Sequence, residues 1–524
     1  MVFKKLAEQQ GSQRGTIFLG APEAEAEANY NSQMPLSAVY KDHCELIPSL
    51  AHEKFLIIGR KGTGKSAFAE YICSISQSDP NMFAKFIRQS DISFEGIIQA
   101  GLEGGHPINK ESLYQWLILT NILKLFSENA AIKESRDYNL LRQFLNKNSG
   151  YIDIRESEVT EIIKKQGFDI NVDYLKRFFS TKLSKTLEIK QEKAPFYKLI
   201  PHLKEVLISV LTSEFERHNH NSYVLFFDDL DIGFDAQNPA SIKSLVSLIR
   251  ASKEINNELF AKNSIDAKVV LLLRDDITKK LSSLETDTFK VISSYAVHIN
   301  WYQDDHINHN ADASLNIKKF INDRIKHAFQ EENLAYDDKD PWKSLVEDPF
   351  SNNQSISNVK STFRYVLDHT FFRPRDLLLF FKPLSLRPYK LPLTKYDINQ
   401  LIGIYCEEII NELKNELSSF YSATEISCIF SAFGVISSLQ SKFEEKSVKY
   451  DEAISIITDH CSTVSPSQLL EDMFQRSLVG SISSFGTPNF KHREPATKKY
   501  ELNPGDNVVI QTALRIYCHN KGYR

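Results

Sequence analysis

The stretch FLIIGRKGTGKSAF, residues 55–68, decides the fold of this chain because it joins an apolar run to a glycine-rich turn. Its spacing fits Gly-x-x-x-x-Gly-Lys-Ser, in which glycines let successive backbone N–H groups face a phosphate. Residues 55–58 have the composition of a buried parallel strand, and residues 65–76 have the apolar spacing of an amphipathic helix. The N-terminus of such a helix adds a positive dipole end. The stretch therefore predicts a phosphate-binding loop between a strand and a helix.

Each position of this loop has a predicted task. We expect Lys65 to reach the β- and γ-phosphates of a nucleotide and the Ser66 hydroxyl to ligate Mg²⁺. The simpler alternative is a turn that contains glycine by coincidence, and the flanking strand and helix disfavour it. The predicted nucleotide-binding residues of the loop are Gly59, Arg60, Lys61, Gly62, Thr63, Gly64, Lys65, Ser66 and Ala67.

Composition and charge are those of a large globular protein. The 524 residues are 42% hydrophobic and 25% charged, so we expect roughly two to four domains with sizeable cores. The formal net charge of -4 gives no overall sign of nucleic-acid binding, and the six scattered cysteines lack a C-x-x-C pair, as is typical of reduced thiols. The N-terminus lacks the apolar core of a signal peptide, and no apolar run approaches the length of a membrane helix. We therefore expect a cytoplasmic protein without a membrane partner.

A second apolar run, YVLFFDDLD at residues 223–231, ends in acidic residues. Ligands of parallel sheets bind at the carboxyl ends of the strands, so Asp228 and Asp229 are candidate site residues. We predict that Asp228 holds Mg²⁺ through its water shell and that Asp229 orients or polarises the attacking water. The alternative is an acidic surface turn after a strand. Because no convincing Asn-Lys-x-Asp guanine-reading motif is present, the predicted cofactors are ATP and Mg²⁺.

A third apolar run, KVVLLLRDD at residues 268–276, ends in Arg274. A guanidinium at the end of a neighbouring strand can contact the γ-phosphate and report its presence. The alternative is that Arg274 pairs with Asp275, Asp276 or another nearby surface group.

The segments IIGRKGTGKS, FFDDLD and LLLRDD, in this order, resemble the STAND group of signal-transduction ATPases and, more broadly, the AAA+-related P-loop ATPases. The resemblance covers about residues 50–300, apart from a long insertion. It implies ATP hydrolysis with Lys65, Asp229 and Arg274 as catalytic residues and a sheet in which the strand before Arg274 lies between the other two. Many fast ATPases of this class have Glu where Asp229 stands, and the shorter carboxylate fits slow, switch-like turnover.

Residues beyond 300 change to a helical pattern. In FFRPRDLLLFF, residues 371–381, Pro374 can open a helix. The segment resembles the second-sensor segment of AAA+ lids, which implies that Arg375, or else Arg373, touches the nucleotide. An equally simple alternative is that both arginines pair with lid carboxylates.

The last part of the chain is predicted to be winged-helix-like, because a helix, a short strand, a polar loop, a second strand and a terminal helix follow one another. From residue 487 onward seven Lys and Arg residues face three Asp and Glu residues, which is compatible with duplex contact but modest. In STAND proteins a winged helix packs on the ATPase core, and its histidine often touches the nucleotide. VVIQTAL, residues 508–514, lacks such a histidine. We favour a structural or regulatory role over DNA reading.

The predicted fold class is α/β: a P-loop NTPase parallel sheet with a helical insertion, a helical lid and a C-terminal winged-helix-like domain. The predicted boundaries are 1–50 for an N-terminal arm, 51–300 for the ATPase core with an all-helical insertion at about 105–215, 301–395 for the lid and 396–524 for the last domain.

Three hypotheses remain from the sequence. The leading one is an ATP-dependent switch or assembly ATPase, forming a homo-oligomer and controlling a separate effector, because no nuclease, protease or NAD-cleaving site is recognisable. Resemblance to free-standing bacterial ATPases implies a role in antiviral defence. The second is a DNA-bound initiator or loader, and the third is a nucleotide-binding interaction module that does not hydrolyse ATP.

Overall fold

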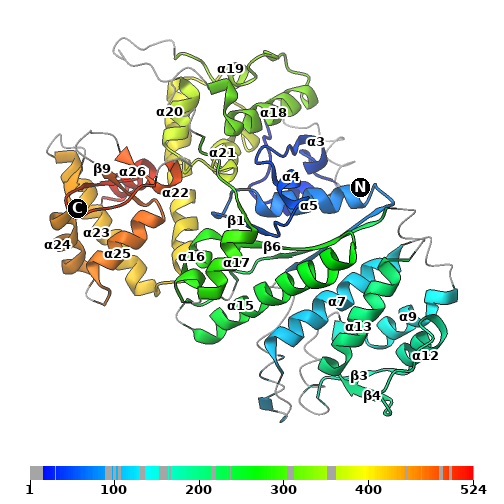
Figure 1. Ribbon diagram of the computed structural model, residues 1–524. Helices are drawn as coiled ribbons and strands as arrows, with labels where there is room; N and C mark the ends of the chain where they lie inside the picture. The colour runs from blue at the N-terminus through cyan, green and yellow to red at the C-terminus, as the bar shows by residue number, and fades with distance from the viewer. Residues whose placement is uncertain are drawn as a thin grey trace. The chain divides into compact units, whose positions relative to one another are not determined.

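The structure is a computed structural model in which the chain divides into two compact units (Figure 1). The lid unit comprises Met1–Glu45, Arg60–Ala67 and Ile299–Arg524, and the sheet unit comprises Leu46–Gly59 and Phe68–His298. The phosphate loop is thus grouped with the lid, whereas the strand before it belongs to the sheet unit. The predicted domain boundaries stay predictions. The structure describes residues 16–522 except 30, 89–96, 98, 100–101, 104, 106–107, 130–135, 153–162, 164–166, 214–219, 233, 237, 285, 304–311, 351–360, 443–446, 462, 483–487 and 495–498.

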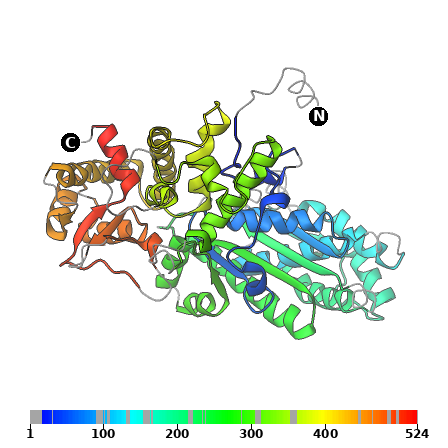
Figure 2. The same cartoon turned by 90° about the horizontal axis from the view of Figure 1, so that it is seen from above.

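A five-stranded parallel sheet forms the core of the sheet unit (Figures 1 and 2). Its strands are β1 (Leu56–Gly59), β2 (Met82–Arg88), β5 (Ser222–Asp228), β6 (Ala267–Arg274) and β7 (Ala296–His298). They lie in the order β2-β5-β6-β1-β7, and each neighbouring pair is parallel. β6 therefore lies between β1 and β5, as the resemblance implied.

The carboxyl ends of four strands meet at one edge of this sheet. Gly59, the last residue of β1, is in register with Arg274 at the end of β6. Arg88, the last residue of β2, is in register with Asp228 at the end of β5. This register brings Asp228 and Arg274 to the edge at which parallel sheets bind ligands.

Helices cover both faces of β5. α5 (Lys65–Ser76) packs Phe68 against Phe226 with ring centroids 6.0 Å apart. α7 (Lys110–Glu128) packs Phe126 against Tyr223 with ring centroids 6.4 Å apart. Residues 223 and 226 point to opposite faces because side chains alternate along a strand. Burial on both faces explains why β5 is a continuous apolar run in the sequence.

The predicted insertion, about residues 105–215, is mostly helical but not all-helical. α7 lies against α13 (Phe196–Leu211) and α15 (Pro239–Glu254), and α9 (Arg136–Lys147) packs with α12 (Asp173–Lys182) (Figure 1). Two short antiparallel strands, β3 (Asp169–Asn171) and β4 (Lys193–Pro195), correct the all-helical prediction. Strands of three residues are too short to show alternation in a sequence.

The part of the lid unit after residue 300 begins with helices around an aromatic core. The helices are α18 (Asn316–Glu331), α20 (Thr362–Asp368), α21 (Pro374–Phe381) and α22 (Lys395–Leu417). Trp342 is fully buried, and its ring centroid lies 5.1 Å from that of Phe363 and 5.7 Å from that of Phe381. Pro374 opens α21 as predicted, because the first turn of a helix does not use its N–H groups.

The C-terminal part combines helices with a four-stranded antiparallel sheet. The helices are α23 (Ala423–Lys442), α24 (Tyr450–His460), α25 (Pro466–Gln475) and α26 (Thr512–Asn520). The strands are β8 (Val448–Lys449), β9 (Val479–Ile482), β10 (Pro488–Asn489) and β11 (Asn507–Ile510). They lie in the order β10-β9-β11-β8, and each neighbouring pair is antiparallel. α25, β9, β11 and α26 occur in the predicted order, but strand β10 lies in the stretch predicted as a polar loop, and the winged-helix-like domain stays a prediction. Of the basic tail residues, Lys498 and Arg524 lie outside the described residues.

The predicted fold class is confirmed. A parallel α/β sheet with the phosphate-loop stretch after its β1 strand is followed by a largely helical C-terminal region. Within the described residues, none of the helices combines the length and the apolar character that crossing a bilayer requires.

Candidate nucleotide-binding site

Two glycines of the phosphate loop have backbone conformations that other residues rarely adopt. Gly62 has a φ of +78° and Gly64 a φ of +95°. A Cβ atom on Gly62 would also lie 2.9 Å from the Cβ of Arg375, closer than side-chain atoms pack. Glycine is therefore required at both positions, because it alone enters this region without a steric penalty.

The carbonyl of Arg60 accepts several hydrogen bonds from within the loop. It accepts hydrogen bonds from Thr63 N at 3.3 Å, Thr63 Oγ1 at 2.8 Å and Lys65 Nζ at 3.1 Å. The Lys65 ammonium therefore lies over the loop, at the first residue of α5, where the sequence predicts a phosphate ligand.

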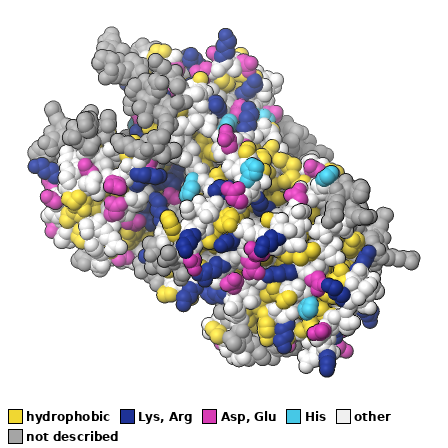
Figure 3. All heavy atoms as spheres, in the orientation of Figure 1, with side chains coloured by type: hydrophobic (Ala, Val, Ile, Leu, Met, Phe, Trp, Pro, Cys, Tyr) yellow, Lys and Arg dark blue, Asp and Glu magenta, His cyan; other side chains and the backbone are white. Residues whose placement is uncertain are grey.

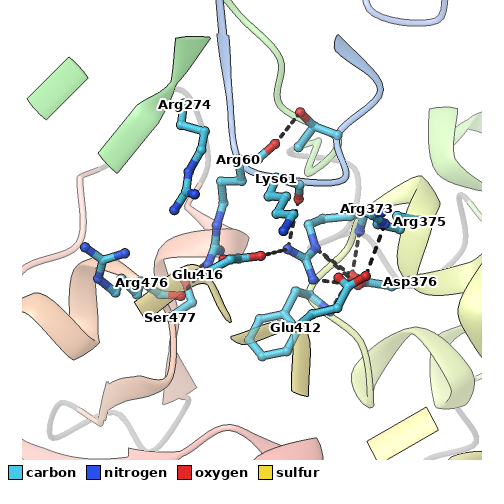
Figure 4. Close-up of polar contacts among 12 residues, drawn as sticks. Arg60, Lys61, Arg274, Arg373, Arg375, Asp376, Glu412, Glu416, Arg476 and Ser477 are labelled. Carbon is cyan, nitrogen blue, oxygen red and sulfur yellow. Dashed lines mark hydrogen bonds and ion pairs between the residues drawn. The ribbon is translucent and has the colours of Figure 1, made fainter. Parts of the chain in front are cut away.

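The next three carbonyls of the loop are bound by groups of the lid. Lys61 O accepts from Arg373 Nη1 at 2.9 Å, and Figure 4 shows this guanidinium between the loop and α21. Gly62 O accepts from the backbone N of Arg375 at 3.3 Å. Thr63 O accepts from the indole Nε1 of Trp301 at 2.9 Å.

Arg373 is a buried member of an ion-pair network. Its side chain is 2% exposed, and its Nη2 donates to Asp376 Oδ1 at 2.8 Å, while Nη1 lies 3.5 Å from Glu416 Oε1 (Figure 4). Burial lowers the pKa of Arg373, but the carboxylates of Asp376 and Glu416 outweigh burial and raise it. The structure thus shows the alternative interpretation of Arg373, in which it pairs with lid carboxylates.

Arg375 also pairs with carboxylates. Its Nε lies 3.3 Å from Glu412 Oε1, and its Nη2 lies 3.3 Å from Glu23 Oε1. Burial raises the pKa of Glu412, although Arg375 and Arg373 lower it. The aliphatic stem of Arg375 covers Gly62, so this arginine contacts the loop through its backbone and stem.

The predicted catalytic carboxylates lie at the end of β5. Asp228 is buried, and its Oδ1 accepts from the backbone N of Asp229 at 2.8 Å. Asp229 has a φ of +56°, in the left-handed region, and its side chain is 32% exposed. Non-glycine residues in this region are uncommon and cluster at functional sites.

Arg88 is a charged neighbour of Asp229 that the sequence analysis did not find. Its Nε lies 3.9 Å from Asp229 Oδ2, and its Nη2 donates to Glu70 Oε1 at 2.5 Å. The sequence pattern that could have indicated Arg88 is MFAKFIR in β2, an apolar-rich strand that ends in an arginine, as β6 does. This pattern is weak because β2 is only partly buried and contains Lys85.

Arg274 is held by two aspartates of the sheet unit. Its Nη2 lies 2.6 Å from Asp276 Oδ2, and its Nη1 lies 3.0 Å from Asp231 Oδ2. Only 7% of its side chain is exposed. Arg274 thus pairs with Asp276, which was one of the alternatives that the sequence left open. It also pairs with Asp231, which the sequence did not indicate as a partner.

The side chain of Arg60 reaches the C-terminal part of the lid unit. Its Nη1 donates to Ser477 Oγ at 3.0 Å, and its Nη2 donates to the carbonyl of Arg476 (Figure 4). Ser477 Oγ also accepts from the backbone N of His492 at 2.8 Å. His492 is buried, and burial together with Arg493, Arg60 and Arg373 holds its pKa well below the usual value. A buried histidine thus lies near the loop, although VVIQTAL contains none.

Comparisons with known proteins give fold similarity only. Neither a protein-family model nor a curated protein matches the sequence. Among solved structures, the chain is similar to the Aeropyrum pernix ORC2 protein in its ADPNP-ADP complexes, with a TM-score of 0.37, 10% identity and 98% of both chains covered. The ADP form of the ORC2 protein gives 0.28, 11% identity and coverage of 94% and 95%. CDC6P from Pyrobaculum aerophilum gives 0.27, 12% identity and coverage of 90% and 88%. These low TM-scores assign no function, and the strand order and the loop by themselves define a P-loop α/β fold.

Proposed function

We propose that this chain is a slow ATP-binding and ATP-hydrolysing switch. The observation that carries the proposal is the loop after β1, in which Gly62 and Gly64 have positive φ values and the carbonyls of Lys61, Gly62 and Thr63 are bound by donors from the lid. A loop with this geometry directs its backbone N–H groups to one side, as phosphate binding requires. It leads into α5, whose N-terminus favours an anion.

The residues present fit a nucleotide with Mg²⁺. Lys65 supplies a cation for the phosphates, and Ser66 and Asp228 supply oxygen atoms of the kind that Mg²⁺ prefers. The ion, when bound, would neutralise charge on the phosphates.

Asp229 is the proposed residue that orients the attacking water. Its left-handed backbone and its partly exposed side chain point to a role outside the hydrophobic core. Arg88 Nε lies 3.9 Å from its carboxylate, so a positive charge stands beside the proposed water-orienting group. The short side chain of Asp229 supports slow turnover, which suits a switch.

Arg274 is the proposed γ-phosphate sensor. A phosphate would compete with Asp276 and Asp231 for the guanidinium, and both are charged, hydrogen-bonded partners. Exchange of these partners would give ATP and ADP different effects on β6 and on α16 (Asp275–Leu284), which begins directly after Arg274.

We propose a separate effector as the partner and a homo-oligomer as the assembly. Acidic and basic side chains both occur on the face drawn in Figure 3. The formal net charge of -4 favours a protein partner over duplex DNA. A role in antiphage defence and DNA-bound initiator or loader activity stay predictions, as does a nucleotide-binding module that does not hydrolyse ATP.

Steady-state MgATP turnover by the full chain, with and without duplex DNA at two salt concentrations, tests the proposal. We expect slow turnover that DNA does not change, and a loss of about 10²- to 10⁴-fold for Asp229→Asn with nucleotide affinity retained. Asp287→Asn is the control, because this aspartate lies on the surface with 75% of its side chain exposed.

Strong, salt-sensitive stimulation by DNA would favour the initiator or loader instead. Binding without turnover in the wild-type protein would favour the interaction module.

A further inference from the structure

We infer that Trp301 and Arg373 are positioning residues that hold the phosphate loop in its binding conformation from the side opposite the phosphates. This inference rests on the proposed function, and it gives Arg373 a role different from that of a nucleotide sensor. It begins from two hydrogen bonds, Trp301 Nε1 to Thr63 O at 2.9 Å and Arg373 Nη1 to Lys61 O at 2.9 Å.

Peptide geometry links each of these bonds to one N–H group of the loop. In a trans peptide the C=O of one residue and the N–H of the next point in opposite directions. The bond to Lys61 O therefore fixes the direction of the Gly62 N–H, and the bond to Thr63 O fixes that of the Gly64 N–H. Gly62 and Gly64 are the two loop residues with positive φ, so they are the ones whose peptides would otherwise turn most freely.

Trp301 is suited to this task by its chemistry and its packing. The indole N–H only donates, so it can bind the carbonyl but cannot compete as an acceptor for the loop N–H groups. Its ring makes edge contacts with His43 and Phe320, with centroid distances of 6.1 and 5.8 Å. Because Trp301 is 8% exposed, its donor has a fixed position.

Arg373 is held in place by carboxylates on two helices. Asp376 of α21 and Glu416 of α22 bind its guanidinium, and Asp376 also accepts from the backbone N of Phe371 at 3.0 Å. A guanidinium has five N–H donors, so Arg373 can serve Asp376 and still donate to Lys61 O. The buried side chain of Arg373 thus contacts α21, α22 and the loop at the same time.

The two roles of Arg373 predict different nucleotide selectivity. A sensor of the γ-phosphate contributes to ATP binding alone. A residue that orients loop N–H groups contributes equally to ADP, ATP and inorganic pyrophosphate, because all of them occupy the same N–H groups. A residue that only stabilises the lid would lower the melting temperature without changing any of these affinities in the folded protein.

Trp301→Phe in the full chain is the first test, since it removes the N–H and keeps an aromatic ring. We expect the Kd values of MgADP, MgATP and pyrophosphate, measured by calorimetry, to rise together by about threefold to tenfold, the range for one lost hydrogen bond. Trp342→Phe is the matched control: Trp342 Nε1 also donates to a buried oxygen, Thr362 Oγ1 at 3.0 Å, but in the lid core. It should lower the melting temperature and leave all three Kd values unchanged.

Arg373→Lys is the second variant, and it carries the test if Trp301→Phe does not fold. It keeps the charge for Asp376 but lacks the second arm that reaches Lys61 O, so the same parallel rise in Kd is expected. Unchanged affinities in the folded variants would overturn the inference, and a loss confined to ATP would return Arg373 to the sensor role. If the wild-type chain bound neither ADP nor ATP, the proposed function would fall as well.

Discussion

At the scale of single residues, the charged groups of the site already have oxygen partners within the protein. Lys65 binds Arg60 O, and Arg274 binds Asp276 and Asp231. The Lys65 bond is to a neutral carbonyl, whereas the Arg274 bonds to two carboxylates are charge-assisted, as a bond to phosphate would be. A nucleotide bound as proposed would compete with these local partners for the same donors.

Lys65→Ala should weaken MgATP binding by about 10-fold or more, because a hydrogen bond to a charged group is worth about 1.5–3 kcal/mol. Lys65 Nζ donates to the neutral carbonyl of Arg60, and the loss of such a bond costs only about 1 kcal/mol, so we expect a small loss of stability. Calorimetric titration with MgATP measures the effect. Lys262→Ala, which removes an ammonium from an exposed i,i+4 pair, is the control. Equal affinity in Lys65→Ala and the wild type would rule out the phosphate loop.

At the scale of elements, α21 is the helix that connects the loop to the lid. Asp376 accepts from the backbone N of Arg373 at 3.2 Å at the start of this helix and also neutralises the Arg373 side chain. One carboxylate thus caps the helix and compensates a buried charge. At the start of α22, Asp397 likewise accepts from the backbone N of Thr394, at 2.9 Å, but this cap is exposed.

Asp376→Ala should destabilise the protein by about 3 kcal/mol or more, because it leaves a buried guanidinium with only part of its compensation and also removes a helix cap. Asp397→Ala removes a cap from an exposed helix start and should cost about 1 kcal/mol. Thermal unfolding of both variants gives the comparison. Equal losses would mean that the buried Arg373 pair adds nothing to the cap.

At the scale of the whole molecule, stability in acid depends on histidines of the lid unit. Burial lowers the pKa of His43, His369 and His492, and for His492 the nearby Arg493, Arg60 and Arg373 lower it further. His492 Nδ1 has no hydrogen-bond partner among the described residues. His492 Nε2 accepts from Arg493 Nε at 3.1 Å, so the neutral ring carries its hydrogen on Nδ1. Protonation would place a second hydrogen on the ring, at Nε2, against the Arg493 donor, and would add a charge beside three guanidinium groups.

The melting temperature should fall as the pH is lowered below about 6.5, because the unfolded chain then binds protons that the folded chain does not. A histidine whose pKa is lowered in the folded protein contributes its full stabilisation when the pH is above its pKa in the unfolded chain. This stabilisation is lost as the pH falls below that pKa. His492→Phe should reduce this dependence, by at most about 1.4 kcal/mol per pH unit. His220→Phe, at an exposed histidine, is the control. A pH dependence in His492→Phe as steep as in the wild type would contradict this assignment.

The sequence by itself determined the phosphate loop, the strands that carry Asp228 and Arg274, the bounds of α5 and the start of α21 at Pro374. These features follow from local patterns: apolar runs, helical spacing, and glycine and proline at positions that need their backbone properties. The position of β6 between β1 and β5 came from the resemblance of the motifs, and the sheet has this order.

Only the tertiary structure decided which partners the charged side chains take, that Trp301 donates to Thr63 O, and that Arg88 lies beside Asp229. Arg373, Arg375 and Arg274 could each reach any of several carboxylates, and the sequence contains no preference among them. The partners depend on burial, because a guanidinium group that is removed from water must pair with the acceptors that the fold places around it. Trp301 and Thr63 are distant in the chain, so no local pattern predicts the bond that joins them.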